Sequence, residues 1–173
     1  MRNLLTAAAV AALSLAATPA FAQDAAPASI FSGPRLGVVV GSGGEDIGDF
    51  DGATIGVDAG YDWDLGGAVF GVGAEYQTDL GDDIFDVNET ALLARIGAKA
   101  GDRALVYASG GYTHISSGAT PFGGVGADGY RIGGGVELAL GDNGTSLKLE
   151  QRYLDYGNGA DVFQTVAGLS FRF

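Results

Sequence analysis

The chain has 173 residues, no cysteine and a formal net charge of −12, yet its mean hydropathy is positive, at +0.21. The length is that of one domain, and the lack of cysteine excludes a fold held by disulfides. The acidic balance argues against nucleic acid as a partner, because its phosphates need basic side chains to neutralise them.

The N-terminal segment has the pattern of a secretory signal peptide. Arg2 supplies positive charge, residues 4–17 are almost all small or apolar, and residues 19–22 end in a small-x-small cleavage site. The apolar run is shorter than the roughly 20 residues that a transmembrane helix needs. We therefore expect export through the Sec pathway and cleavage after Ala22. The expected division of the chain is a signal peptide over 1–22, a flexible leader over 23–32 and one β-barrel domain over 33–173.

The remaining chain contains eight segments in which apolar residues alternate with polar residues or glycine, the period of two that strands show. The clearest covers residues 52–63, where Ile55, Val57 and Ala59 alternate with polar residues and glycine. Val106 and Tyr107 leave the phase of one segment, 104–114, open. The other six segments are 34–41, 68–78, 89–100, 129–140, 145–156 and 162–173. Hydrophobicity spread over segments of about ten residues is typical of a transmembrane β-barrel.

The connections between these segments alternate in length. Short turns rich in Gly and Asp are expected at 64–67, 101–103 and 141–144, and longer loops at 42–51, 79–88, 115–126 and 157–161. An even number of strands with alternating short and long connections predicts an all-β, eight-stranded, antiparallel, up-and-down transmembrane β-barrel. In such barrels the short turns face the periplasm, so we expect both termini to be periplasmic.

Charged side chains occupy the strand face opposite the apolar one and alternate there with glycine, which leaves room for long side chains to pair across a narrow barrel. The interior of eight strands is just wide enough for side chains to fill, so a plugged lumen is predicted. The predicted lumen charge network consists of Arg35, Asp58, Glu75, Arg95, Arg131, Glu137, Lys148, Glu150 and Arg152. An interfacial aromatic girdle is predicted from Tyr61, Trp63, Tyr76, Tyr107, Tyr130 and Tyr153.

Acidic residues cluster in the first two long loops, at residues 45–51 and 79–86. We interpret them as solvated loops, since their spacing does not match a calcium loop. Loosely held Ca²⁺ or Mg²⁺ that bridges these loops to lipopolysaccharide is the alternative. The sequence has no His or Cys cluster with metal-ligand spacing, and we expect neither a metal nor another cofactor.

The last strand carries Leu169, Phe171 and Phe173 on one face and Ser170 and Arg172 on the other. A soluble protein with such exposed rings on a terminal strand would be prone to aggregation. We therefore expect lipid to cover this face and the strand to close the barrel against the one that begins at residue 34.

Three stretches, 33–37, 149–157 and 169–173, resemble the small eight-stranded outer-membrane proteins of the Omp25/opacity type, relatives of the barrel of outer membrane protein A. The resemblance implies a Gram-negative outer-membrane location, contact with lipopolysaccharide and a monomeric state. It also implies that Leu169, Phe171 and Phe173 form the signal read by the barrel-assembly machinery. The implied role is structural or surface-interactive, and the peptidoglycan-binding domain of larger relatives has no counterpart in this sequence.

Two other functions stay open, a small-solute porin and a hydrolase. His114, Ser116 and the downstream Asp128 resemble the site of the outer-membrane lipid A deacylases, in which an imidazole activates a serine and an acid orients the ring. The match is partial, because Ser117 stands where that family has Asn, and the acid is Asp rather than Glu. A non-enzymatic role is therefore preferred.

Overall fold

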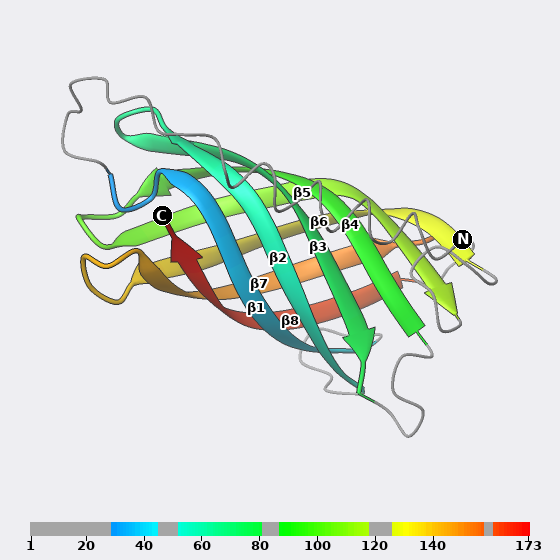
Figure 1. Cartoon of the computed structure of the whole chain (residues 1–173). Helices are drawn as coiled ribbons and strands as arrows, with labels where there is room; N and C mark the ends of the chain where they lie inside the picture. Colours follow the sequence, from blue (N-terminus) through cyan, green and yellow to red (C-terminus); the bar gives the residue numbers. More distant parts are fainter. Residues whose placement is uncertain (1–28, 45–51, 81–86, 118–125, 158–160) are drawn as a thin grey trace, which may run out of the picture.

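The computed structural model describes residues 29–44, 52–80, 87–117, 126–157 and 161–173, which form a closed barrel of eight antiparallel strands (Figure 1). The strands are β1 (Gly33–Gly44), β2 (Ala53–Asp64), β3 (Ala68–Asp79), β4 (Val87–Lys99), β5 (Ala104–Ser117), β6 (Gly126–Ala139), β7 (Thr145–Asp155) and β8 (Asp161–Arg172). Each strand pairs with its neighbours in sequence, and β8 pairs with β1 to close the barrel. The predicted fold is confirmed. Within the described ranges no helix is long and apolar enough to cross a membrane.

The barrel has two different ends. The start of β1, the end of β8 and the three short connections lie at one end, which we call the turn end (Figure 1). Gly66, Gly101 and Gly144 have positive φ angles of 91°, 76° and 78° in these connections, a conformation that favours glycine. The ends of β1, β3, β5 and β7 and the starts of β2, β4, β6 and β8 lie at the opposite end, which we call the loop end.

Six of the eight strands run further toward the loop end than the alternation of side chains predicts, whereas β2 and β7 stop one residue short there. The start of β4 pairs with the end of β5 through Val87 and Ser117, and the end of β1 pairs with β8 through Gly44 and Phe163. Backbone pairing does not require an apolar side chain, so Gly and Ser extend the ladder where the hydrophobic pattern has already stopped.

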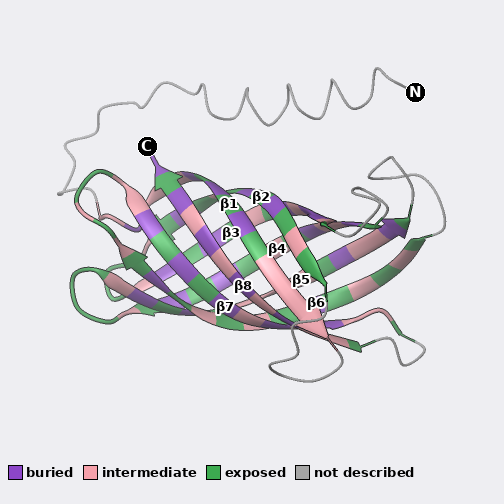
Figure 2. Cartoon of the chain, turned by 90° about the horizontal axis from the view of Figure 1, so that it is seen from below, coloured by how far each residue is buried: buried purple, intermediate pink, exposed green. Residues whose placement is uncertain are grey.

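Burial alternates along the strands, with an apolar outer wall and a polar interior (Figure 2). Leu92 and Leu149 on the outer wall are 62% and 59% exposed. Strand β5, whose phase the sequence leaves open, turns Leu105 and Tyr107 inward and Val106 outward. The assignment of Tyr107 to the girdle is therefore wrong: three consecutive apolar residues hide the phase, and the ring is 5% exposed inside the lumen.

Residues before β1 cover the turn end of the lumen. Phe31 is fully buried and packs with Val69, Leu105 and Tyr107, while the guanidinium of Arg172 lies 5.6 Å from the centre of its ring. The end of the segment expected to be a flexible leader thus contributes to the core. The rest of that segment and the whole expected signal peptide lie outside the described residues.

Candidate functional site

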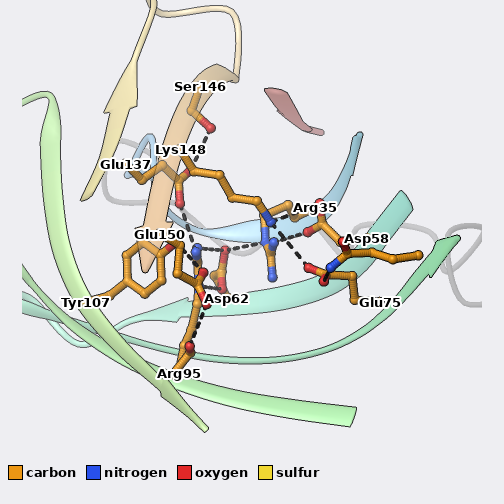
Figure 3. A network of polar contacts seen from close by, with 12 residues as sticks. Arg35, Asp58, Asp62, Glu75, Arg95, Tyr107, Glu137, Ser146, Lys148 and Glu150 are labelled. Carbon is orange, nitrogen blue, oxygen red and sulfur yellow. Dashed lines mark hydrogen bonds and ion pairs between the residues drawn. The ribbon is translucent and has the colours of Figure 1, made fainter. Parts of the chain in front are cut away.

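The lumen contains a network of ion pairs (Figure 3). Its first group lies toward the turn end of the strands. Arg95 on β4 donates from Nε and Nη2 to Asp62 on β2, at 2.9 and 2.6 Å, and from Nη1 to Glu137 on β6, at 2.9 Å. Arg172 on β8 contacts the same two carboxylates, at 3.0 and 2.5 Å. Asp62 and Glu137 are fully buried, and Ser146 also donates to Glu137 at 2.6 Å. Two guanidinium groups therefore neutralise two carboxylates across the barrel.

A second group of charges follows in the middle of the lumen. Glu75 on β3 accepts hydrogen bonds from Arg131 at 2.9 Å and from Arg152 at 2.7 and 2.8 Å. Lys148 Nζ lies 3.2 Å from Asp58 and 3.8 Å from Glu75. Asp58 in turn pairs with Arg35. These contacts join five strands by side chains alone.

Glu150 and Tyr107 connect the two groups. Tyr107 donates its hydroxyl to Glu150 at 2.7 Å, and Ser109 and Arg152 donate to the other oxygen of Glu150, both at 2.9 Å. The ring of Tyr107 also lies 5.1 Å from the guanidinium carbon of Arg95. Because the phenol meets a carboxylate on one side and a guanidinium on the other, it belongs to the network.

Glycine on neighbouring strands provides the space for these long side chains. A Cβ added at Gly71 would lie 3.1 Å from Cγ of Arg95, and one at Gly60 would lie 2.8 Å from Nη2 of Arg35. Real Cβ atoms are rarely this close to other atoms, so a larger residue would displace the charged side chains. Glycine therefore alternates with charged residues in the sequence because the charged side chains need the space that glycine leaves.

The structure brings all nine residues of the predicted lumen charge network together. Asp62 and Arg172 also belong to the network, and the alternation already places both on the same charged face. Glu89 is the first residue of the predicted segment 89–100, and it accepts from Arg131 at 3.1 Å and from Thr113 at 2.8 Å. Tyr107 belongs to the network too, which the open phase of β5 does not predict.

Six basic and six acidic residues form this ion-pair network, so their charges balance. The basic residues are Arg35, Arg95, Arg131, Lys148, Arg152 and Arg172, and the acidic ones are Asp58, Asp62, Glu75, Glu89, Glu137 and Glu150. The cavity between them has a volume of about 30 Å³, the space of about one water. Side chains thus fill the middle of the barrel.

A separate polar cluster lies on the outer wall near the loop end, at the position of the hydrolase hypothesis. His114 Nδ1 lies 2.6 Å from Oδ1 of Asp128, and the hydroxyl of Tyr112 donates to the same oxygen. Ser116 follows His114 by two residues on β5, so its side chain leaves the same side of the strand. Ser116 is only 2% exposed, whereas the Asp128 side chain is 67% exposed. The structure brings the histidine and the acid together and places the serine on their side of the wall.

The predicted assembly signal lies on the outer face at the end of β8 and on the residue that follows it. Phe171 and Phe173 are 45% and 73% exposed, and Leu169 lies two residues earlier on the same face. The acidic segments at 45–51 and 81–86 lie outside the described residues. In the parts that the structure describes, no group of three or more His, Cys, Asp or Glu residues could hold a metal ion.

Comparisons with known proteins agree with this architecture. The model of the family described as outer membrane protein beta-barrel domain matches residues 8–173. No curated protein matches the chain. Among solved structures, the N-terminal barrel of OprF from Pseudomonas aeruginosa is 17% identical with a TM-score of 0.59, over 82% of this chain and 99% of that one.

Two further barrels show the same fold. Ail, the attachment invasion locus protein of Yersinia pestis, is 16% identical with a TM-score of 0.55, over 82% of this chain and 97% of that one. The outer membrane enzyme PagL is 16% identical with a TM-score of 0.53, over 80% and 99%. At such identities the structural likeness concerns the fold, and the family assignment rests on the family match. The chain belongs to the outer membrane β-barrel family, and that family places it in the Gram-negative outer membrane.

Proposed function

We propose that the protein is an integral outer-membrane barrel with a structural or surface-interaction role and a plugged lumen. The loop end faces the outside and the turn end, with both termini, faces the periplasm after export through the Sec pathway. The protein is a monomer that contacts lipopolysaccharide with its outer wall. The barrel-assembly machinery inserts it by reading Leu169, Phe171 and Phe173.

The observation that carries the plugged lumen is the network of Arg95, Asp62, Glu137 and Arg172, which crosses the barrel between four strands. Breaking a buried ion pair by removing one partner costs about 3–5 kcal/mol. An ion that passed along the lumen would have to disrupt several such pairs together. The small-solute porin is therefore the weaker alternative.

Recording of single channels in planar bilayers tests this proposal. We expect no step-like conductance from the purified, folded barrel. Folding is checked first on SDS gels, where a folded barrel migrates differently before and after boiling. Steady, step-like conductance from protein that passes this check would favour the porin and reject the plugged barrel.

The topology is tested separately on whole cells. Protease added outside should cleave an insertion at the loop end, within residues 118–125, and should leave an insertion in the short connection 100–103 intact until the outer membrane is permeabilised. Cleavage in the reverse order would reject the proposed orientation.

A lipid A hydrolase is the second candidate, favoured by the 2.6 Å contact between His114 and Asp128 on the outer wall. An acid that orients a histidine beside a serine is the arrangement that activates a nucleophile. PagL, an outer membrane enzyme, shares the fold. The low exposure of Ser116 places this candidate below the structural role.

Deacylation of lipid A decides between the two. Wild type and the Ser116→Ala variant are incubated with lipopolysaccharide, and released fatty acid is measured. Activity that is present in wild type and lost in the variant would establish the hydrolase. No release by either protein would remove this candidate.

A further inference from the structure

The loop end of the barrel contains a second cavity, which we call the vestibule. Its volume is about 220 Å³, or room for about seven waters at their liquid volume of about 30 Å³ each. Its walls come from seven of the eight strands, and the ion-pair network lies between it and the turn end. The mouth of a β-barrel is one of the places where proteins bind small molecules. The lining of the vestibule therefore indicates what it could hold.

The floor of the vestibule is polar, uncharged and ordered by its own hydrogen bonds. Thr54 donates to the amide oxygen of Gln77 at 2.7 Å, and the amide nitrogen of Gln164 lies 3.2 Å from both Thr54 Oγ1 and Gln77 Oε1. Gln77 also donates to Glu75 at 2.6 Å, which links the floor to the lumen network. Because these groups hold one another in place, a ligand would meet a prearranged set of donors and acceptors.

The upper wall of the vestibule is apolar. Val87, Ile115, Leu154 and Val162 line it from four strands, together with Tyr156 just after β7. Burial raises the pKa of Tyr156, so its ring stays uncharged. Aliphatic side chains gain free energy when they move from water into an apolar contact. This wall would therefore favour a ligand with an apolar body.

The charged groups that line the vestibule are all acidic. Asp79 and Glu89 contribute carboxylates, and the described lining includes neither Lys nor Arg. In the sequence, the connections 45–52, 80–86, 118–125 and 156–160 carry seven carboxylates and no basic residue. Clefts bounded by charge of one sign concentrate ions of the opposite sign. Cations should therefore enter in preference to anions.

We propose that the vestibule is a binding site for a small organic cation with an apolar body, such as an arylalkyl amine. The ammonium group lies toward Glu89 and Asp79, and the apolar body lies among Val87, Ile115, Leu154 and Val162. The ring of Tyr156 adds a cation–π contact. This site goes beyond the structural role proposed above, since a plugged barrel would keep that role without a ligand.

The test uses phenethylammonium as the probe and the folded, full barrel in detergent micelles. Backbone amide NMR shifts are followed as the probe is added, and 3-phenylpropionate, which has the same apolar body and a negative charge, is titrated in parallel. We expect saturable shifts at residues that line the vestibule with phenethylammonium, and binding at least about tenfold weaker with the anion. Shifts that do not saturate, or equal binding of the two probes, would overturn the proposal.

Matched variants separate the vestibule from general attraction to an acidic protein. Glu89→Gln keeps the shape and an acceptor for Thr113 and Arg131, and we expect it to weaken binding about tenfold. Asp161→Asn removes the same charge at the same end of the barrel, from a residue that does not line the vestibule, and should change affinity less than about twofold. Equal effects of the two changes would overturn the proposal.

A cavity-filling variant gives a second readout. Val162→Trp places a ring in the vestibule, and we expect it to abolish the saturable shifts. Undiminished binding by folded Val162→Trp would also overturn the proposal. If the variant does not fold, the comparison of Glu89→Gln with Asp161→Asn decides the question by itself.

Discussion

Replacement of Arg95 by methionine tests the lumen network at the residue that joins two of its carboxylates. Methionine is apolar and unbranched, but it leaves Asp62 and Glu137 buried with one partner fewer each. Loss of one partner from a buried ion pair costs about 3–5 kcal/mol. Because Arg172 still contacts both carboxylates, we expect the lower end, about 3 kcal/mol of lost free energy of unfolding.

Urea unfolding of the barrel from lipid vesicles measures this loss, with Trp63 fluorescence as the signal. Trp63 is the sole tryptophan and is 43% exposed on the outer wall, so its ring leaves the lipid on unfolding. Arg103→Met is the control, because the Arg103 ion pair is exposed and such pairs contribute about 0–1 kcal/mol. Equal losses in the two variants would refute the reasoning. Adding Glu137→Gln to Arg95→Met should restore much of the stability, because one positive and one negative charge are then removed and Arg172 still pairs with Asp62.

Three further predictions concern packing and assembly. Gly111→Ala should destabilise the barrel by about 2 kcal/mol or more in the same unfolding assay, because its Cβ would collide with the Leu92 carbonyl. Gly110→Ala should be tolerated, because the nearest neighbour of its Cβ would be the Arg131 carbonyl oxygen at 3.6 Å, an ordinary contact. Phe31→Ala should cost about 3 kcal/mol, whereas Leu65→Ala in an exposed turn at the same end should cost little. Deletion of Phe173 should slow insertion in cells, measured by pulse-chase, and barely change the unfolding of barrels already folded; insertion at the wild-type rate would contradict the assembly role.

The alternation of side chains was sufficient to predict the fold because the two faces of this wall meet very different surroundings. Ile55, Val57 and Ala59 are exposed on the outer wall, and the residues between them face a charged interior, so inside and outside can be read directly from the sequence. The same reading fails at Leu105, Val106 and Tyr107, where three apolar residues follow one another. There only the pairing with β4 and β6 determines which side chain points inward.

The membership of the lumen network was predictable, but its pairing was not. Arg95 meets Asp62 and Glu137, which lie 33 and 42 residues away in the sequence. Which carboxylate an arginine reaches depends on the register of several strand pairs and on the tilt of the strands in the closed barrel. The contact between His114 and Asp128 follows from hairpin register, since these two residues are directly paired on β5 and β6.

The positions of the Lys and Arg residues in the barrel indicate where partners can bind. After residue 22 the chain has eight Lys and Arg residues: six lie in the lumen network, and Lys99 and Arg103 lie at the turn end. The connections 45–52 and 80–86 carry seven carboxylates and no Lys or Arg of their own. A macromolecule that binds this end must bring cationic groups or dissolved cations, and its affinity should fall as salt shortens the Debye length from about 10 Å at 0.1 M to about 3 Å at 1 M. The buried lumen pairs are screened much less, so salt should weaken surface contacts while barrel stability changes little.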